Sequence, residues 1–242
     1  MSIWGKIIGG AAGFALGGPL GGLLGGLAGH AVDRLSGPGE EGTDGTRQIA
    51  FTIGVIVLGA KMAKADGVVT RDEIQAFREV FSVPQDEMEN VGRVFNLARR
   101  DASGFEPYAR QIARLFQENK QPLEDLLHGL FHIAKADNVV HPAELEFLKS
   151  VAEIFGFSEA DFARIRTYHM PPDAQDPYII LDIPHDASDD DVKRAYRRQV
   201  RENHPDKLIA EGLPQEFVDV ANEKVAAINE AYESIAKQRG LN

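Results

Sequence analysis

The sequence predicts an all-α protein with an N-terminal transmembrane helix, a bundle of about seven helices and a C-terminal helical hairpin. Three observations predict this fold class. A long uncharged stretch lies near the amino terminus, and a seven-residue motif occurs twice in the middle of the chain. Two amphipathic segments near the end flank a His-Pro-Asp tripeptide. Apolar residues in these middle and terminal segments recur at helical spacing, so we expect helices throughout.

The composition excludes several classes of function. The chain has 242 residues, a formal net charge of -11 and no cysteine. This length has room for one large or two small domains. The acidic balance argues against a surface built as a whole to bind nucleic acid. Without cysteine there is no disulfide, no cysteine nucleophile and no cysteine-ligated zinc or iron–sulfur site. We therefore expect no cofactor and no nucleic-acid partner.

The first part of the chain has the pattern of a membrane anchor. Between residues 7 and 32 the only ionisable side chain is that of His30, which is usually neutral. This stretch is longer than the roughly 18 apolar residues that indicate a spanning helix. It also exceeds the roughly 7–15-residue core of a secretory signal. We predict that residues 1–35 form a retained, single-pass transmembrane anchor in contact with membrane lipid.

Glycines in this anchor recur at every fourth position. They are Gly5, Gly9, Gly13, Gly17, Gly21, Gly25 and Gly29. Such a stripe lets two membrane helices approach closely, which predicts a homodimer through the transmembrane helix. Alternatively, glycine merely supplies apolar, flexible sequence, and Pro19 could kink the helix. Basic residues barely favour either side of the membrane, because Lys6 precedes the stretch and Arg34 follows it.

A predicted linker separates the anchor from a central helical domain. Residues 36–46 are rich in turn-forming residues and lack apolar periodicity, so we expect a flexible tether. The uncharged stretch 49–60 is too short to cross a membrane, and we interpret it as a buried helix of a domain covering 47–168. Apolar spacing predicts further helices at about 85–100, 105–118, 122–136 and 158–167.

The repeated motif lies in this central domain. Residues 63–69 read AKADGVV, and residues 134–140 read AKADNVV. Gly67 and Asn138 are the two residue types that most readily end a helix in the left-handed conformation. A helix-start pattern follows each of them, so each copy predicts a helix, a tight turn and a second helix. The paired Lys-Ala-Asp turns and the helical arrangement resemble the TerB domain.

Four acidic residues of the two copies are candidate metal ligands: Asp66, Glu73, Asp137 and Glu144. If the copies face each other, these carboxylates could hold a divalent cation through oxygen ligands. The spacing is too short for a twelve-residue calcium loop. Acidic side chains in a first helical turn also interact favourably with the helix dipole, so helix capping is the simpler explanation.

The end of the chain predicts a helical hairpin. Asp176 and Pro177 open a short turn that ends at Leu181. Ser188 can then cap an amphipathic, strongly basic helix at about 189–203. A second helix is predicted at about 214–238, where apolar residues alternate at steps of four and three. Two antiparallel helices with facing apolar seams form a hairpin.

The segment between these helices is predicted as a stiff loop. It comprises Asn203, His204, Pro205, Asp206 and Lys207. Proline cannot continue a helix, and it biases the preceding histidine away from helical geometry.

Four features of this region resemble a J-domain. They are YIIL at 178–181, AYR at 195–197, HPDK at 204–207 and INEAYE at 228–233. An isolated HPD tripeptide can recur by chance, but four motifs in order at hairpin spacing are specific. The resemblance covers residues 176–242. It implies a protein that is not itself an enzyme but stimulates ATP hydrolysis by a DnaK-type chaperone.

The resemblance also assigns roles to individual residues. The HPD residues that would trigger hydrolysis in the partner are His204, Pro205 and Asp206. The surrounding docking surface would comprise Lys193, Tyr196, Arg197, Arg198 and Lys207. Two positions depart from the family pattern and are expected to lower stability slightly. Asp182 stands where glycine is common, and Gln199 stands where a leucine often faces the hairpin core.

The order of anchor, TerB-like domain and J-domain resembles membrane-anchored co-chaperones of the bacterial inner membrane. Since a DnaK-type partner and its ATP are cytosolic, residues 33–242 are expected to face the cytoplasm. One alternative is a membrane sensor or scaffold whose TerB-like domain binds a metal ion or a protein partner. Another is a nucleic-acid binder that uses the basic helix, which a salt-dependent shift of DNA would reveal.

Overall fold

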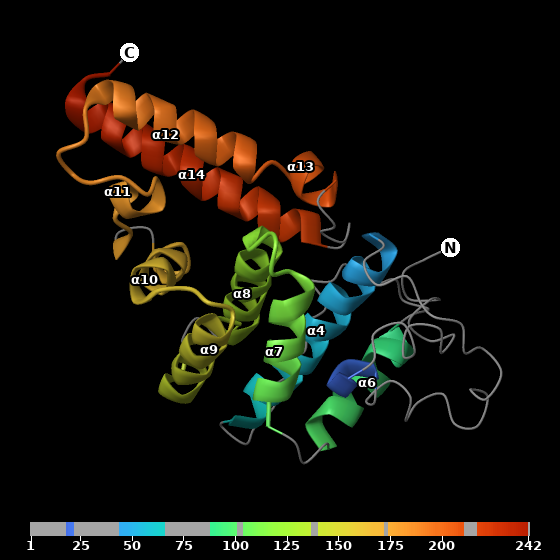
Figure 1. The fold of residues 1–242 in the computed structure, drawn as a ribbon. Helices are drawn as coiled ribbons and strands as arrows, with labels where there is room; N and C mark the ends of the chain where they lie inside the picture. Colours follow the sequence, from blue (N-terminus) through green and yellow to red (C-terminus); the bar gives the residue numbers. More distant parts are fainter. Residues whose placement is uncertain are drawn as a thin grey trace.

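The computed structural model describes residues 18–21, 44–65, 88–100, 104–136, 140–171, 174–210 and 217–241. Within these ranges every regular element is a helix, which confirms the predicted all-α class. Figure 1 shows a bundle below and a long two-helix hairpin above it.

Helix α4 (Asp44–Ala65) is the centre of the bundle. Its residues 51–63 are buried, so the predicted buried helix is confirmed. Contacts surround it from α6 (Met88–Arg100), α7 (Glu106–Leu115), α8 (Gln121–Ala134) and α9 (Pro142–Ile154). At Gly54 an added Cβ would lie 2.7 Å from Cδ1 of Ile112, so glycine permits the close approach of α4 and α7. Helix α4 begins within the segment predicted as a linker.

Local capping signals explain where α9 and α10 (Glu159–Thr167) begin. The carboxylate of Glu144 accepts a hydrogen bond from the backbone N–H of His141 at 2.9 Å. The hydroxyl of Ser158 accepts one from the N–H of Asp161 at 3.2 Å. These side chains satisfy backbone donors that a helix start leaves without an intrahelical partner.

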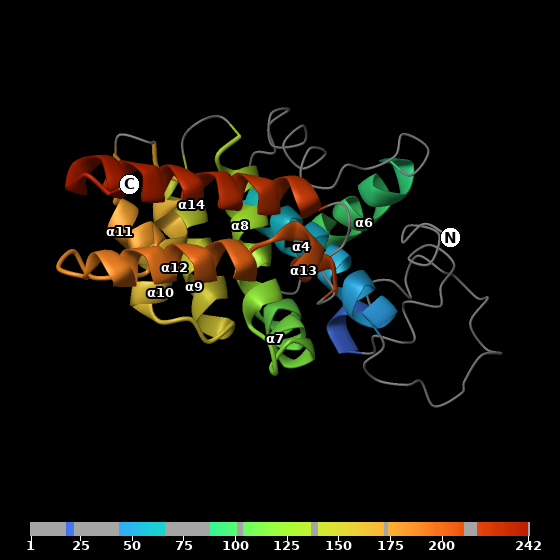
Figure 2. The ribbon, with the colours of Figure 1, turned by 90° about the horizontal axis from the view of Figure 1, so that it is seen from above.

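The C-terminal hairpin comprises α11 (Pro177–Ile180), α12 (Asp189–Glu202), α13 (Pro205–Ala210) and α14 (Val218–Arg239). Helices α12 and α14 lie side by side in both ribbon views (Figures 1 and 2). The hydroxyl of Ser188 accepts a hydrogen bond from the backbone N–H of Asp191 at 3.2 Å, which confirms the predicted cap of α12. A separate apolar cluster fills the hairpin, with Tyr178, Leu181 and Ile228 among its buried members.

The hairpin also packs on the bundle. Four residues of this region join the apolar cluster of the bundle: Leu208 of α13, Phe217 directly before α14, and Val220 and Ala221 of α14. The ring of Phe217 meets that of Phe51 on α4 edge to face, with their centroids 4.8 Å apart. Burial of these apolar groups joins the two parts of the chain.

Little of the predicted membrane anchor lies within the described residues. Residues 18–21 form one helical turn, in which Leu20 is buried and its N–H donates to Oε1 of Gln111 at 2.9 Å. Of the seven striped glycines, only Gly21 belongs to the described ranges. Among the described helices, none combines the length and apolar character needed to cross a membrane.

Candidate functional site

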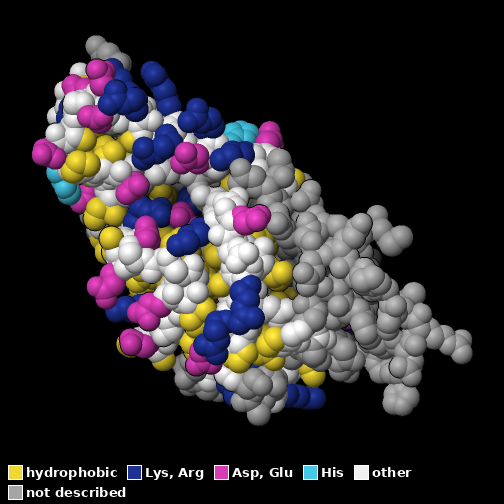
Figure 3. Space-filling view, viewed as in Figure 1, with side chains coloured by type: hydrophobic (Ala, Val, Ile, Leu, Met, Phe, Trp, Pro, Cys, Tyr) yellow, Lys and Arg dark blue, Asp and Glu magenta, His cyan; other side chains and the backbone are white. Residues whose placement is uncertain are grey.

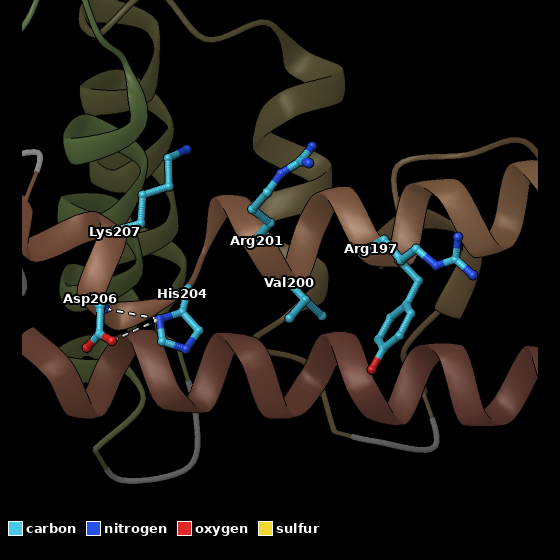
Figure 4. A pocket seen from close by; sticks show the side chains of 7 residues that line it. Arg197, Val200, Arg201, His204, Asp206 and Lys207 are labelled. Atoms are coloured by element: carbon cyan, nitrogen blue, oxygen red, sulfur yellow. Dashed lines mark hydrogen bonds and ion pairs between the residues drawn. The ribbon is translucent and has the colours of Figure 1, made fainter.

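An open groove of about 600 Å³ lies where α12 meets α13. Its lining residues are Tyr196, Arg197, Val200, Arg201, His204, Asp206 and Lys207. Figure 4 shows how six of them lie, with His204 and Asp206 facing each other and Lys207 pointing away from that pair. Two consecutive turns of α12 and the first turn of α13 therefore form this groove.

The His-Pro-Asp tripeptide has a more ordered geometry than the predicted loop. Helix α12 ends at Glu202, and α13 already begins at Pro205. The turn is therefore confined to Asn203 and His204, and the prediction of a loop through Lys207 was wrong. Proline suits the first position of a helix, because its missing N–H would have no intrahelical partner there and its φ is already helical. The same residue thus ends one helix and opens the next.

A hydrogen bond within the turn orients the imidazole. The backbone N–H of Asp206 donates to Nδ1 of His204 at 3.2 Å. A carboxylate oxygen of Asp206 lies 3.8 Å from the same nitrogen. Since Nδ1 accepts a hydrogen bond, the neutral ring carries its proton on Nε2. Both side chains are exposed, at 53% for His204 and 90% for Asp206, so a partner can reach them.

Tyr196 connects the groove to α14. Its ring stacks on that of Tyr232 with centroids 4.2 Å apart, and its hydroxyl donates to Oδ1 of Asn229 at 3.0 Å. These contacts join the AYR motif to the INEAYE motif across the hairpin. Tyr196 is thereby fixed as one wall of the groove, with its ring half-buried.

The rim of the groove is positively charged. Arg197, Arg201 and Lys207 line it with exposed side chains, and α12 also carries Arg194 and Arg198. Figure 3 shows Lys and Arg side chains gathered across the upper part of the molecule, over the hairpin. In a chain with a net charge of -11, this local surface favours an acidic partner.

The structure brings together five of the eight predicted docking residues: Tyr196, Arg197, His204, Asp206 and Lys207. Lys193, Pro205 and Arg198 do not line the groove. The side chain of Arg198 instead lies 4.0 Å from a carboxylate oxygen of Glu202.

Sequence reasoning missed two groove residues, Val200 and Arg201. Helical spacing could have found the arginine, because Arg201 follows Arg197 by one turn on the same face of the helix.

The proposed metal ligands do not form a described site. Asp66, Glu73 and Asp137 lie outside the described residues. Glu144 is buried, and its carboxylate caps the start of α9. In the part of the chain that the structure describes, no group of three or more potential ligand side chains surrounds a common point.

Three family models match the chain in the order that the sequence predicts. The model for the transmembrane domain of the co-chaperone DjlA matches residues 1–49. The model for the tellurite resistance protein TerB matches residues 52–167, and the DnaJ domain model matches residues 176–239. These matches confirm the predicted combination of a membrane anchor, a TerB-like domain and a J-domain.

Curated relatives match the chain over its whole length. The co-chaperone protein DjlA of Vibrio cholerae is 34% identical, and the alignment covers 100% of both chains. DjlA of Shewanella oneidensis is 32% identical with the same coverage. DjlA of Photobacterium profundum is 30% identical over 99% of this chain and 100% of that protein. No solved structure matches the chain.

Proposed function

Because this chain belongs to the DjlA family of membrane-anchored J-domain co-chaperones, we propose that it stimulates the ATPase of a DnaK-type chaperone through the groove at His204. One observation carries this proposal. The α12 motif and the His-Pro-Asp turn line the same groove, and Tyr196 in that groove contacts Asn229 and Tyr232 of the α14 motif.

The charged, apolar and polar residues of the groove have different roles in docking. Arg197, Arg201 and Lys207 attract and orient an acidic surface of the partner, since charged rims raise association rates and fix register. Tyr196 and Val200 offer apolar surface between these charges. The His204–Asp206 turn presents exposed polar groups in a fixed arrangement. The chain contributes no catalytic group, because hydrolysis takes place in the partner.

We further propose that the anchor crosses the bacterial inner membrane once and that residues 33–242 face the cytoplasm. The match to the DjlA transmembrane domain supports the anchor, and the cytosolic location of a DnaK-type partner and its ATP supports the orientation. The chain would then recruit the chaperone to the membrane surface.

The experiment titrates the full chain, reconstituted in lipid discs, into a DnaK-type chaperone with ATP and follows phosphate release. The wild type should give a saturable stimulation. Arg201→Ala should raise the half-saturating concentration by about threefold to tenfold, because one charge-assisted contact is lost. Arg194→Ala is the matched control, since Arg194 is also exposed on α12 but does not line the groove. No stimulation by the wild type, or equal shifts in both variants, would contradict the proposal.

A further inference from the structure

The His-Pro-Asp turn is held on both sides by contacts outside the groove. Asn203, directly before His204, is buried, and its Oδ1 accepts a hydrogen bond from Nε2 of Gln121 on α8 at 3.2 Å. Its Nδ2 donates to the backbone carbonyl and to Oε1 of Gln199, at 2.8 and 3.1 Å. Leu208, two residues after Asp206, is buried in the apolar cluster of the central domain. The central domain therefore hydrogen-bonds the residue before the turn, and Leu208 after the turn shares the apolar cluster of that domain.

Lys224 of α14 forms a second support. Its Nζ lies 2.7 Å from Oε1 of Glu124 and 3.4 Å from Oδ1 of Asp125, and only 2% of its side chain is exposed. The guanidinium of Arg164 on α10 donates to both oxygens of Glu124, at 3.1 and 2.7 Å. Glu124 thus joins α8, α10 and α14 through one carboxylate.

These groups are charged although they are buried. Burial would raise the pKa of Glu124, but Lys224 and the hydrogen bonds to its carboxylate hold that pKa well below its usual range. Burial opposes the charge of Lys224, but Glu124 and Asp125 raise its pKa above the usual value. Removing one partner from such a pair is strongly destabilising, because it leaves an uncompensated buried charge. In the observed arrangement of the hairpin on the bundle, Glu124 lies between the opposite charges of Lys224 and Arg164.

We propose that the central domain positions the His204-Pro205-Asp206 turn for docking, with Gln121, Glu124 and Lys224 as positioning residues. This inference rests on the proposed function, because it assigns the central domain a role in the same docking event. The domain then determines how the turn is presented to the chaperone, in addition to linking the J-domain to the membrane.

Loss of these supports should loosen the turn without unfolding the hairpin. The hairpin has its own apolar cluster, which includes Leu181, Val192, Ile228 and Ile235, and none of these residues belongs to the cluster of the bundle. When the supports are removed, some molecules leave the docking-competent arrangement. The apparent affinity for the chaperone then falls in proportion to the competent fraction.

The test compares two single variants of the full chain, each in lipid discs. Lys224→Met removes the buried charge but keeps a straight side chain, and Gln121→Ala removes the bond to Asn203 from the central domain. Lys237→Met is the matched control, because Lys237 is an exposed lysine on the same helix. Amide hydrogen exchange of residues 203–209 reports the turn. Since the sequence has no cysteine, spin labels at Arg110→Cys and Glu233→Cys report the distance between bundle and hairpin.

In both test variants the amide hydrogens of residues 203–209 should exchange faster than in the control. Lys224→Met should also broaden the distribution of distances between the labels on the bundle and the hairpin. The concentration of each variant that gives half-maximal ATPase stimulation should rise. The rise is about tenfold if a tenth of the molecules remain competent for docking, and the maximal rate should stay the same. Unchanged exchange and unchanged half-saturation in Gln121→Ala would overturn the inference, even if Lys224→Met failed to fold. If the wild type did not stimulate ATP hydrolysis, the proposed function would fail, but exchange and distances would still test the positioning.

Discussion

At the residue scale, Asp182 connects a sequence departure to a backbone conformation. It follows α11 with φ of 55°, in the left-handed region. Glycine is common at this position of the family, and glycine adopts such a φ without the clash that a Cβ causes. Asp182 therefore holds a conformation that its own side chain disfavours.

Asp182→Gly should stabilise the chain by up to about 1 kcal/mol, because relief of the left-handed strain exceeds the added entropy of the unfolded chain. Urea unfolding followed by helical circular dichroism would measure the change. Asp186→Gly is the control at a nearby aspartate without positive φ, and it should destabilise slightly. A loss of stability in Asp182→Gly would contradict the interpretation that the backbone of Asp182 is strained.

A buried histidine pair predicts how stability depends on pH. Nδ1 of His128 lies 2.9 Å from Nε2 of His169. Burial, with a smaller effect of Lys224, lowers the pKa of His128 to about 4, and burial also lowers the pKa of His169 well below its usual value. Asp125 has the opposite effect on how stability changes with pH, because burial raises the pKa of its carboxyl to about 6.

The unfolded chain binds protons at these histidines near pH 6.5, but the folded chain does not bind one at His128 until about pH 4. The stability that His128 contributes is therefore complete above pH 6.5 and is lost as the pH falls toward 4. Replacement by glutamine in His128→Gln should make the unfolding free energy less dependent on pH, by up to about 1 kcal/mol per pH unit. Urea titrations at pH 6.5, 5.5 and 4.5 would measure how the unfolding free energy of the wild type and of His128→Gln changes with pH. Equal changes in the two proteins would contradict this role of His128.

At the element scale, local signals predicted most helix starts. Ser158, Ser188 and the Pro142–Glu144 segment mark helix starts that the structure confirms. The start of α13 was missed because Pro205 was interpreted only as a helix breaker, although proline equally suits a first helical position. Local pattern does not distinguish these two uses of proline. The structure shows that Leu208 of α13 is buried in the same apolar cluster as residues of α4, which lie far away in the sequence.

The glycine stripe of the anchor predicts self-association, which remains a prediction. Gly13→Leu and Gly17→Leu together should separate the two anchors, because the larger side chains prevent close approach of the backbones. Energy transfer between labelled full-length chains in liposomes would measure the dimer. A control with Ala11→Leu and Ala15→Leu, placed away from the stripe, should keep the signal. Equal signals in both pairs, or no transfer in the wild type, would rule out the stripe as the contact face.

At the scale of the whole molecule, the sequence predicts the order of domains but not how they meet. The contacts that join them pair Phe51 with Phe217, Gln121 with Asn203 and Glu124 with Lys224, and each pair is far apart in the sequence. Nothing in local periodicity identifies such partners. Gln199 illustrates the consequence. Because glutamine replaces a common leucine there, the sequence predicted a slightly less stable hairpin. In the structure, the Gln199 side chain accepts a hydrogen bond from Asn203, whose side-chain Oδ1 accepts one from Gln121 of α8.

In the proposed function, the groove at His204 allows this membrane-anchored chain to stimulate a DnaK-type ATPase. The decisive measurement is single-turnover ATP hydrolysis by such a chaperone, with saturating full chain in lipid discs. The wild type should accelerate the turnover, and His204→Gln should abolish the acceleration. His185→Gln should retain it, since exposed His185 lies outside the groove. Equal acceleration by the wild type and His204→Gln would contradict the claim.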